Sequence, residues 1–399
     1  MRIVSIAPFM PFQGIPHAGG EFYRRHAELA SRSHDFLIVS PKIPENETAM
    51  AESGSPPYAR LLVPPRAPRG RPGRLFSYVL SRAVPFLAVR PFYRALLEDQ
   101  QALFAMRRAD RIELQWFNAV VLAPKLRRAF PGTPIVGVFH DIVSQGQARM
   151  LYTRGVALRW RLLALAQFVF AVPMERRVMR SLDTAVVLSE KDRALLARRG
   201  GTAGIVVVSP PLDDEDMPRS PRLDPPDVPE VLFVGALWRV ENEDAAQWLL
   251  REIWPKVVAA VPAATLTIAG AEPSPALRRE AERHGSVRLT GYVKSLGPYY
   301  ERASVVVAPM RLGAGVKLKS VVAMLWGLPV VATRVGAEGV SGPQVFLAVE
   351  DHSESFAKAL IGVLKDPASA RDVRDRAYRW SHDTYSPASY LRSLDRVYS

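Results

Sequence analysis

APMRLGAGVKLKSVVAMLWGLPVVAT, residues 308–333, is the stretch that decides the fold. It begins where an apolar run ends, and it continues through the glycine-rich turn Gly313-Ala-Gly315 into a helical pattern that carries Lys317 and Lys319. Gly327-Leu-Pro329 then separates that pattern from a second apolar run. The order of these features predicts a strand, a tight glycine loop, a helix and a second strand.

The glycine loop is predicted to present backbone N–H groups at a helix N-terminus, where the helix dipole favours negative charge. Lys317 and Lys319 add two positive charges in the first helical turn. This combination suits a diphosphate group. The alternative interpretation is an exposed first turn with two solvated lysines, and the spacing alone leaves both interpretations open.

The size of the chain predicts two domains, because 399 residues exceed what one hydrophobic core normally organises. There is no cysteine, which excludes a disulfide framework and a thiolate metal site. The N-terminal residues enter a strand-like run with no visible signal peptide. The longest apolar helical segment, 162–174, is shorter than the roughly 20 residues of a membrane span. We therefore expect a cytoplasmic protein, either free or at the inner face of the membrane.

The charge of the chain favours anionic partners. The net charge is +14 and the estimated pI is about 10.2, which suits phosphorylated substrates, an anionic membrane face or nucleic acid. The sequence shows neither zinc-finger spacing nor the aromatic signature of RNA-binding modules. A nucleic-acid binder is thus supported by charge alone, and we expect no nucleic-acid partner.

Short apolar runs alternate with helical patterns along the whole chain. The runs lie at 3–7, 36–40, 60–63, 112–116, 135–139 and 185–188 in the N-terminal half, and at 231–234, 265–269, 287–289, 305–308, 330–332 and 345–349 in the C-terminal half. Helical patterns between them include 20–32, 92–108, 243–261, 275–284 and 353–364. This alternation predicts parallel sheets with helices on both faces, and hence two doubly wound α/β domains.

A segment rich in proline and acidic residues, 209–229, marks the expected boundary, because proline cannot join a central strand. We therefore expect an N-terminal domain at 1–208, a linker at 209–229 and a C-terminal domain at 230–371. The amphipathic segment 372–399 is predicted to be helical and to pack back on the N-terminal domain. Ligands of such sheets bind beyond the carboxyl ends of the strands, which predicts a site in the cleft between the domains.

The C-terminal half resembles the GT-B glycosyltransferases of the large retaining family four. The matches are the donor loop Gly313-Ala-Gly315 with Lys317 and Lys319, the segments Ala323-Met324, Gly327-Leu-Pro-Val-Val-Ala-Thr333 and Gly336-Ala-Glu-Gly339, and the shorter matches Phe233-Val-Gly235, Asn242-Glu-Asp-Ala245 and Gly291-Tyr-Val293. The N-terminal half is similar more loosely, at Gly19-Gly20, at His140-Asp141 and at 183–191.

This resemblance implies a GT-B fold, in which two Rossmann-like domains face a central cleft. It also implies sugar transfer, with retention, from a nucleotide-sugar to a polysaccharide, glycolipid or small-molecule acceptor. The N-terminal domain would bind the acceptor, and the C-terminal domain would bind a donor expected to be UDP- or GDP-linked. No cofactor and no metal are expected, because protein cations and helix ends neutralise the leaving diphosphate in this family.

The resemblance further implies the residues of the site. Lys317 and Lys319 would neutralise the diphosphate, and His140, after the predicted strand 135–139, would face the reacting sugar. The other implied donor-binding residues are Gly19, Gly20, Arg239, Gly291, Tyr292, Val293, Gly313, Ala314, Gly315, Val316 and Glu338. A structural histidine bonded to a backbone carbonyl is the alternative for His140.

The family pattern is broken at one position. Many members carry two glutamates around the donor loop, and the matching positions here are Ala314 and Val322. Valine cannot accept hydrogen bonds from the donor ribose. One hypothesis is that Glu338 compensates, and another is that the chain is a catalytically degenerate GT-B protein that binds or regulates a partner. A nucleotide-sugar epimerase, which shares the two-domain architecture, is a third alternative.

Two stretches mix basic and bulky apolar residues in the N-terminal half. The basic loop with Arg66, Arg69, Arg71 and Arg74 precedes one of them, 75–94, and the other is 154–180. Such stretches suit the surface of an anionic bilayer, and they predict a peripheral membrane contact near a lipid-linked acceptor. Ordinary helices with one buried face and solvated arginines are the alternative.

Overall fold

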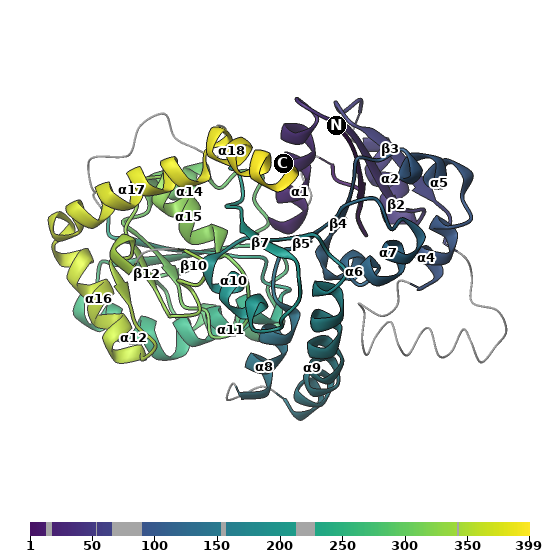
Figure 1. Cartoon of the computed structure of the whole chain (residues 1–399). Coiled ribbons are helices and arrows are strands. Elements are labelled where there is room, and N and C mark those ends of the chain that lie inside the picture. The colour runs from purple at the N-terminus through teal and green to yellow at the C-terminus, as the bar shows by residue number, and fades with distance from the viewer. Residues whose placement is uncertain (13–17, 53, 66–89, 153–156, 213–227, 341–342) are drawn as a thin grey trace. The chain divides into compact units, whose positions relative to one another are not determined.

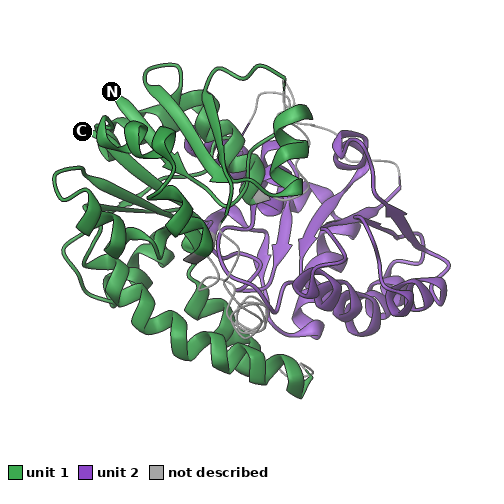
Figure 2. Cartoon of the chain, turned by 90° about the vertical axis from the view of Figure 1, so that its right-hand side faces the viewer, with its two compact units in different colours: residues 1–211, 387–399 green, residues 212–386 purple. Residues whose placement is uncertain are grey.

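The computed structural model describes residues 1–12, 18–52, 54–65, 90–152, 157–212, 228–340 and 343–399. Most of the predicted linker 209–229 lies outside the described residues, as do the basic loop at 66–74 and most of the stretch 75–94. The chain forms two compact units, which Figure 2 colours separately. Unit 1 comprises Met1–Pro211 and Pro387–Ser399, and unit 2 comprises Leu212–Ser386.

Unit 1 is built on a seven-stranded sheet in the order β3-β2-β1-β4-β5-β6-β7, and all neighbouring strands are parallel. The strands are β1 (Arg2–Ile6), β2 (Asp35–Pro41), β3 (Ala59–Val63), β4 (Arg111–Gln115), β5 (Ile135–Phe139), β6 (Thr184–Val187) and β7 (Gly204–Val207). Its described helices are α1 (Ala18–Ala30), α2 (Pro44–Glu52), α4 (Arg90–Leu96), α5 (Gln100–Arg107), α6 (Trp116–Val120), α7 (Ala123–Ala129), α8 (Val143–Tyr152), α9 (Leu158–Met179), α10 (Glu190–Ala197) and α18 (Pro387–Tyr398).

Unit 2 is built on a six-stranded parallel sheet in the order β10-β9-β8-β11-β12-β13. Figure 1 labels β10 and β12 of this sheet. The strands are β8 (Glu230–Val234), β9 (Thr265–Ala269), β10 (Val287–Gly291), β11 (Val305–Ala308), β12 (Val330–Ala332) and β13 (Ala348–Val349). The described helices are α11 (Val240–Trp248), α12 (Trp254–Ala260), α13 (Pro275–Glu282), α14 (Gly297–Arg302), α15 (Leu318–Leu325), α16 (Ser353–Lys365) and α17 (Arg371–Tyr385), with a π-helical turn at Leu249–Ile253 and 3₁₀ turns at Pro343–Val345 and Pro367–Ala370.

The two parallel sheets confirm the predicted doubly wound α/β architecture. In unit 1 the strand order reverses between β1 and β4, and in unit 2 it reverses between β8 and β11. Loops on either side of such a reversal diverge at the carboxyl ends of the strands and leave a crevice in which ligands bind. The fold therefore directs attention to the residues that follow β1, β4, β8 and β11.

Several predicted boundaries were wrong. The helical pattern 92–108 is two helices, because the Asp99 side chain caps a new helix by accepting the Ala102 N–H at 2.8 Å. The predicted run 112–116 ends one residue early, since Trp116 already starts α6. None of the predicted apolar runs corresponds to strand β7. Of the predicted run 345–349, only Ala348–Val349 forms a strand.

The C-terminal segment predicted as one helical piece is two helices that belong to different units. α17 is part of unit 2, whereas α18 is part of unit 1. The break falls at Ser386, which is extended and precedes Pro387, as the steric restriction on residues before proline requires.

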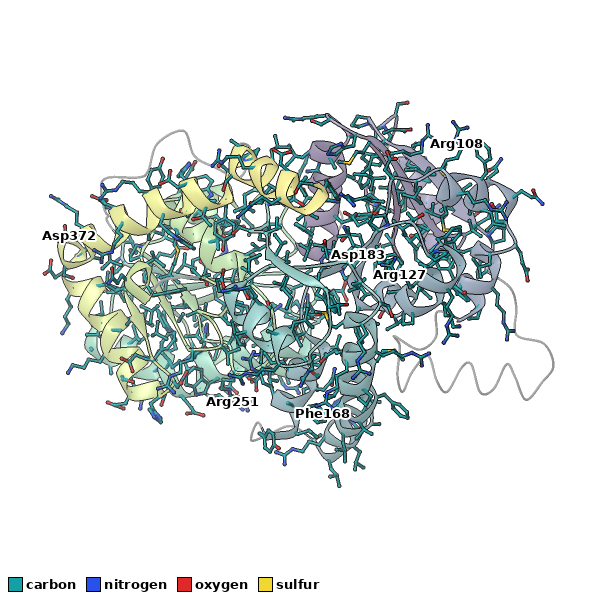
Figure 3. All side chains as sticks on the ribbon, in the orientation of Figure 1. Arg108, Arg127, Phe168, Asp183, Arg251 and Asp372 are labelled. Atoms are coloured by element: carbon teal, nitrogen blue, oxygen red, sulfur yellow. The ribbon has the colours of Figure 1, made fainter. Side chains whose placement is uncertain are left out.

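Polar contacts also hold the sheet of unit 1 to its helices. Arg127, on α7, forms an ion pair with Asp183, just before β6, and the two side chains are labelled together in Figure 3. The same Asp183 carboxylate accepts the backbone N–H of Ile135 at 2.6 Å, which ties the starts of β5 and β6. In the part of the chain that the structure describes, no helix has the length and apolar character needed to cross a membrane.

Candidate functional site

The donor loop of unit 2 lies at the reversal point of its sheet. It connects β11 to α15, and it requires glycine at two positions, since Gly313 and Gly315 have φ values of +97° and +72°. Residues with a Cβ rarely adopt this left-handed region. The two glycines therefore shape the loop in which the sequence predicted a phosphate-binding turn.

Lys317 is folded back on this loop. It immediately precedes α15, its side chain is buried, and its Nζ donates to the carbonyl oxygens of Ala314 and Gly315 at 2.8 and 2.9 Å. The alternative interpretation of a solvated side chain therefore does not hold for Lys317. A buried ammonium group fixed by backbone carbonyls is a preformed positive charge at the helix N-terminus.

Lys319 lies in the first turn of α15 and reaches across to α11, the helix after β8. Its Nζ donates to Asn242 Oδ1 at 2.7 Å, and it lies 4.8 Å from the centre of the Phe233 ring. Burial, with the charges of Lys317 and Arg239, lowers the pKa of Lys319 to about 7, although Glu241 opposes them. Burial and the neighbouring cations both disfavour the charged form of this lysine, and a bound anion would favour it.

Arg239 joins the same group of residues from the other side of the reversal point. It precedes α11, its side chain is half exposed, and it forms an ion pair with Glu241 at 2.5 Å. A Cβ on Gly313 would lie 3.7 Å from Glu241 Cγ and 3.8 Å from Lys317 Nζ. The structure thus brings together Arg239, Gly313 and the two lysines, and their binding of a donor remains a prediction.

Glycines keep the space beside Lys319 open. A Cβ on Gly235 would lie 3.0 Å from Lys319 Nζ and 2.8 Å from Asn242 Cγ. Asn242 is itself held by its Nδ2, which donates to the Ala236 carbonyl at 2.9 Å. The sequence pointed to Asn242 only as part of a family match, and its hydrogen bond with Lys319 was not predicted.

Glu338 and Val322 occupy different surroundings. Glu338 is buried, and its backbone carbonyl accepts the Lys317 N–H at 3.3 Å, so it lies next to the donor loop. Val316 touches the neighbouring Gly339, whose missing Cβ would lie 2.7 Å from Val316 Cα. Val322 is partly buried on α15 and packs against the hydrophobic core of unit 2.

The implied donor-binding residues Gly291, Tyr292 and Val293 lie farther along the same edge of the sheet. Gly291, with a φ of +69°, ends β10, which is separated from β8 by β9. The side chain of Tyr292 is 77% exposed, and Val293 is half-buried. An exposed tyrosine ring at this edge can stack on a flat ligand, since aromatic faces bind bases in this way.

His140 belongs to unit 1 and lies at the carboxyl end of β5, as predicted. Its ring stacks on Trp116, with ring centres 4.2 Å apart, and meets the edge of Phe22 at 5.0 Å. His140 Nε2 forms a hydrogen bond with Gln115 Oε1 at 2.9 Å, so the alternative of a backbone carbonyl as the partner of Nε2 was wrong.

Gly19 and Gly20 lie in the first turn of α1 and not in a loop. A Cβ on Gly19 would lie 3.2 Å from Trp116 Nε1 and 3.3 Å from His140 Nδ1. Gly19 therefore lets the start of α1 approach these two rings, which follow the neighbouring strands β4 and β5. Trp116 was not predicted as a site residue, because in the sequence it only ends an apolar run. Its φ of +62° is a strained value for this residue type.

No metal centre is present in the part of the chain that the structure describes, where no three His, Asp or Glu side chains are grouped closely enough to hold an ion. Metal-independent binding of a diphosphate therefore remains a prediction, and the charges available for it are those of Lys317, Lys319 and Arg239.

Two family models match this chain. The model for glycosyl transferases group 1 matches residues 228–366, and the model for the glycosyl transferase 4-like domain matches residues 23–211. A curated relative is an uncharacterized 44.6 kDa protein in the cps region of Klebsiella pneumoniae. It is 28% identical over 175 residues, which span 41% of this chain and 44% of the relative.

Solved structures share the fold along the full chain. Sucrose-phosphate synthase from Thermosynechococcus elongatus has a TM-score of 0.71 at 18% identity, covering 99% of this chain and 98% of its own. HepE of Anabaena, in complex with UDP and glucose, has a TM-score of 0.67 at 14% identity, covering 100% and 99%. A TarM mutant of S. aureus, in complex with Fondaparinux, alpha-GlcNAc-glycerol and UDP, has a TM-score of 0.64 at 11% identity, covering 100% of each chain.

The two family models cover the sheet of unit 2 and strands β2 to β7 of unit 1, and the solved structures share the GT-B fold. The chain is a group 1 glycosyltransferase of the GT-B fold, a class of enzyme that transfers sugar from a nucleotide-sugar donor.

Proposed function

We propose that this protein transfers a sugar, with retention, from a uridine-diphosphate sugar to a saccharide acceptor. Unit 2 binds the donor and unit 1 the acceptor. The observation that carries the proposal is the grouping of Lys317, Lys319 and Arg239 at the reversal point of unit 2, where burial and the charges of the other two cations lower the pKa of Lys319 to about 7. The choice of UDP is supported by HepE and TarM, both of which were solved with it.

The proposed chemistry follows from charge development. Cleavage of the bond between the sugar and the diphosphate leaves negative charge on the leaving group, and preformed cations stabilise that charge without reorganising. Lys319 and Lys317 supply this stabilisation, together with backbone N–H groups of the donor loop. His140 faces the reacting sugar, and the exposed Tyr292 ring stacks on the base.

An assay of transfer tests the proposal. The protein is incubated with UDP-glucose, UDP-galactose or UDP-N-acetylglucosamine, with oligosaccharide acceptors and EDTA, and UDP release and acceptor mass are measured. We expect one donor to give an acceptor heavier by one sugar. Lys319→Met should lower the rate by roughly 100-fold or more, as the loss of one charge-stabilising donor does elsewhere. Absence of both turnover and nucleotide binding would refute the proposal and restore the degenerate-partner hypothesis.

We further propose that unit 1 docks on an anionic membrane through α9. Figure 1 shows α8 and α9 side by side as a helical pair. Apolar side chains of α9 are exposed to solvent, among them Leu158 at 70% and the residues Trp160, Leu162, Leu165, Val169 and Phe170. Arg159 lies over the Trp160 ring at 5.4 Å. Exposed apolar and basic side chains on one helix suit the interface of an anionic bilayer, where the apolar groups enter and the cations meet lipid headgroups.

Vesicle sedimentation tests this contact. Binding to vesicles with phosphatidylglycerol is expected at low salt, with little binding to phosphatidylcholine alone. The double substitution Leu162→Ser with Phe170→Ser should abolish it. Phe104→Ser on α5 is the matched control, since Phe104 is also an exposed apolar side chain of unit 1, at 62%. An equal loss of vesicle binding in the control, or binding that does not depend on lipid charge, would contradict the proposal.

A further inference from the structure

A buried carboxylate lies in the interior of unit 1, next to the residue that holds His140. Glu113 is on β4, and its side chain is 1% exposed. Its Oε1 accepts hydrogen bonds from Ser5 Oγ at 2.7 Å, from His26 Nε2 at 3.0 Å and from Gln115 Nε2 at 2.8 Å. Its Oε2 accepts one from the Tyr398 hydroxyl at 2.5 Å.

This carboxylate is ionised. Burial by itself raises the pKa of Glu113, but the charge and hydrogen bond of His26, followed by the hydrogen bonds of Tyr398 and Gln115, lower it to about 2. Burial and the Glu113 charge raise the pKa of Tyr398 well above its usual value, so its hydroxyl keeps its proton. Every group around Glu113 is therefore a donor, and Glu113 can only accept.

The charge on Glu113 decides which way the Gln115 amide points. An ionised carboxylate has no hydrogen to give, so the group that faces it must be the amide nitrogen of Gln115. The amide oxygen of Gln115 then faces His140 Nε2, 2.9 Å away. Because this oxygen can only accept, His140 must carry a hydrogen on Nε2. Gln115 itself is fully buried, which leaves its amide little freedom to turn.

The plane of the His140 ring is fixed separately from this hydrogen bond. Trp116 stacks on it with an angle of 11° between the rings, and Phe22 meets it edge-on at 82°. Nδ1 lies on the side of Gly19, at the start of α1. Glu113 and Gln115 are two residues apart on β4, so their side chains share one face of the sheet and can form a chain of hydrogen bonds that ends at His140.

We propose that Gln115 is a positioning residue for sugar transfer, which relays the charge of Glu113 to His140 and holds that imidazole with its hydrogen on Nε2. The kinetic part of this inference rests on the role proposed above for His140, whereas the hydrogen-bond relay does not. Among the side chains that donate to Glu113 Oε1, Gln115 is the one that also contacts His140.

The far end of the chain contributes to this relay. Tyr390 and Tyr398 both lie on α18, and Tyr390 forms a hydrogen bond of 2.6 Å with His26 Nδ1, opposite the nitrogen that meets Glu113. Arg111, at the start of β4, donates to the Tyr398 carbonyl at 2.6 Å. The orientation of Glu113, and through it of Gln115, therefore depends on α18 being packed in place.

The relay is tested with protein labelled with ¹⁵N at histidine. A one-bond ¹H–¹⁵N correlation spectrum of the imidazole region shows which ring nitrogen carries hydrogen, and the His140 signal is assigned by its loss in His140→Gln. We expect a signal from protonated Nε2 in the wild-type protein. Gln115→Met should shift it or lose it to exchange. Ser5→Ala is the matched control, because Ser5 is equally buried and donates to the same oxygen of Glu113 without contacting His140.

Kinetics separate positioning from a merely structural role. Gln115→Met is expected to lower kcat by roughly tenfold or more with little change in the donor KM, the pattern of an interaction made in the transition state. Ser5→Ala should leave kcat unchanged. Adding Gln115→Met to His140→Gln should cause no further loss, as expected if both residues act through one group.

Each contrary result overturns the inference. A wild-type His140 with its hydrogen on Nδ1 contradicts the relay, as does an unchanged Nε2 signal in Gln115→Met. A loss of kcat in Ser5→Ala equal to that in Gln115→Met reduces Gln115 to a structural residue. If the wild-type protein neither binds UDP nor transfers sugar, the proposed function fails, and the spectrum still decides the relay.

Discussion

The ammonium group of Lys319 lies 2.7 Å from the Asn242 amide oxygen, which places a lysine with a pKa of about 7 directly across the sheet reversal of unit 2. Lys319 is on α15, the helix after β11, and Asn242 is on α11, the helix after β8. A neutral amide oxygen stabilises the cation without cancelling its charge. Such a pair would leave positive charge for the diphosphate of the proposed donor.

The affinity for a nucleotide-sugar should fall as the pH rises through 7. Below pH 7 Lys319 is already protonated, whereas above it binding must take up a proton, because a bound diphosphate raises the lysine pKa. The dissociation constant of UDP-glucose should then rise by about tenfold per pH unit until the pKa of the bound state is reached. Calorimetry at pH 6 to 8.5, in buffers of different ionisation enthalpy, measures both the affinity and the proton uptake. Lys319→Met should abolish both effects, and an unchanged slope in that variant would contradict the assignment.

Two substitutions of Asn242 should shift this pH dependence in opposite directions. Asn242→Asp places a negative charge beside Lys319, which raises the lysine pKa and moves the pH dependence upward. The same charge should weaken UDP-glucose binding at pH 6 by roughly tenfold, or about 1.4 kcal/mol. Asn242→Leu removes the hydrogen bond and should move the pH dependence downward. Identical profiles in the two variants would show that Asn242 does not act through Lys319.

Glu338 should hold the donor ribose in place of the glutamate that Val322 replaces. Glu338→Gln is expected to weaken UDP binding by roughly tenfold, since hydrogen bonds to a charged acceptor are worth about 1.5–3 kcal/mol. Binding of 2′,3′-dideoxyuridine diphosphate, which lacks both hydroxyls, should be the same in the two proteins. Equal affinity of Glu338→Gln and the wild type for UDP would exclude the role, and a loss shared by both nucleotides would show a structural defect.

Gly336 should tolerate alanine poorly. A Cβ there would lie 1.9 Å from the Ala308 carbonyl oxygen, at the end of β11 and next to the donor loop. Gly336→Ala is expected to lower the free energy of unfolding by about 1–3 kcal/mol, the usual cost of overpacking. Gly362→Ala is the control, because nothing lies within 4 Å of a Cβ at that helical position, and it should stabilise the protein by roughly 0.5–1 kcal/mol. Urea denaturation measures both, and equal effects would contradict the packing argument.

Features that depend on local sequence were predictable. The apolar runs gave most strands of both sheets, because parallel strands buried on both faces are apolar throughout. The donor loop was predictable because Gly313, Gly315 and both lysines lie within a few residues of one another in the sequence. Strand β7 was not, because its four residues are partly exposed and too short to stand out.

Features that depend on contacts between distant segments were not predictable. Asn242 and Lys319 are 77 residues apart, and His26 and Tyr390 are 364 residues apart. Glu113 and Gln115 lay within a run predicted as an ordinary strand, although two polar residues on one face of a central strand are a signal of a buried network. Nothing in the sequence indicated the positive φ of Trp116.

The most direct test of the account is a calorimetric titration with UDP in the presence of EDTA, on the wild-type protein and on the double variant Lys317→Met with Lys319→Met. We expect the wild type to bind UDP with 1:1 stoichiometry and more tightly than UMP, and the double variant to lose the preference for the second phosphate. Binding of UDP by the double variant with unchanged affinity, or no binding by the wild type, would contradict the claim that Lys317 and Lys319 at the donor loop hold the donor diphosphate.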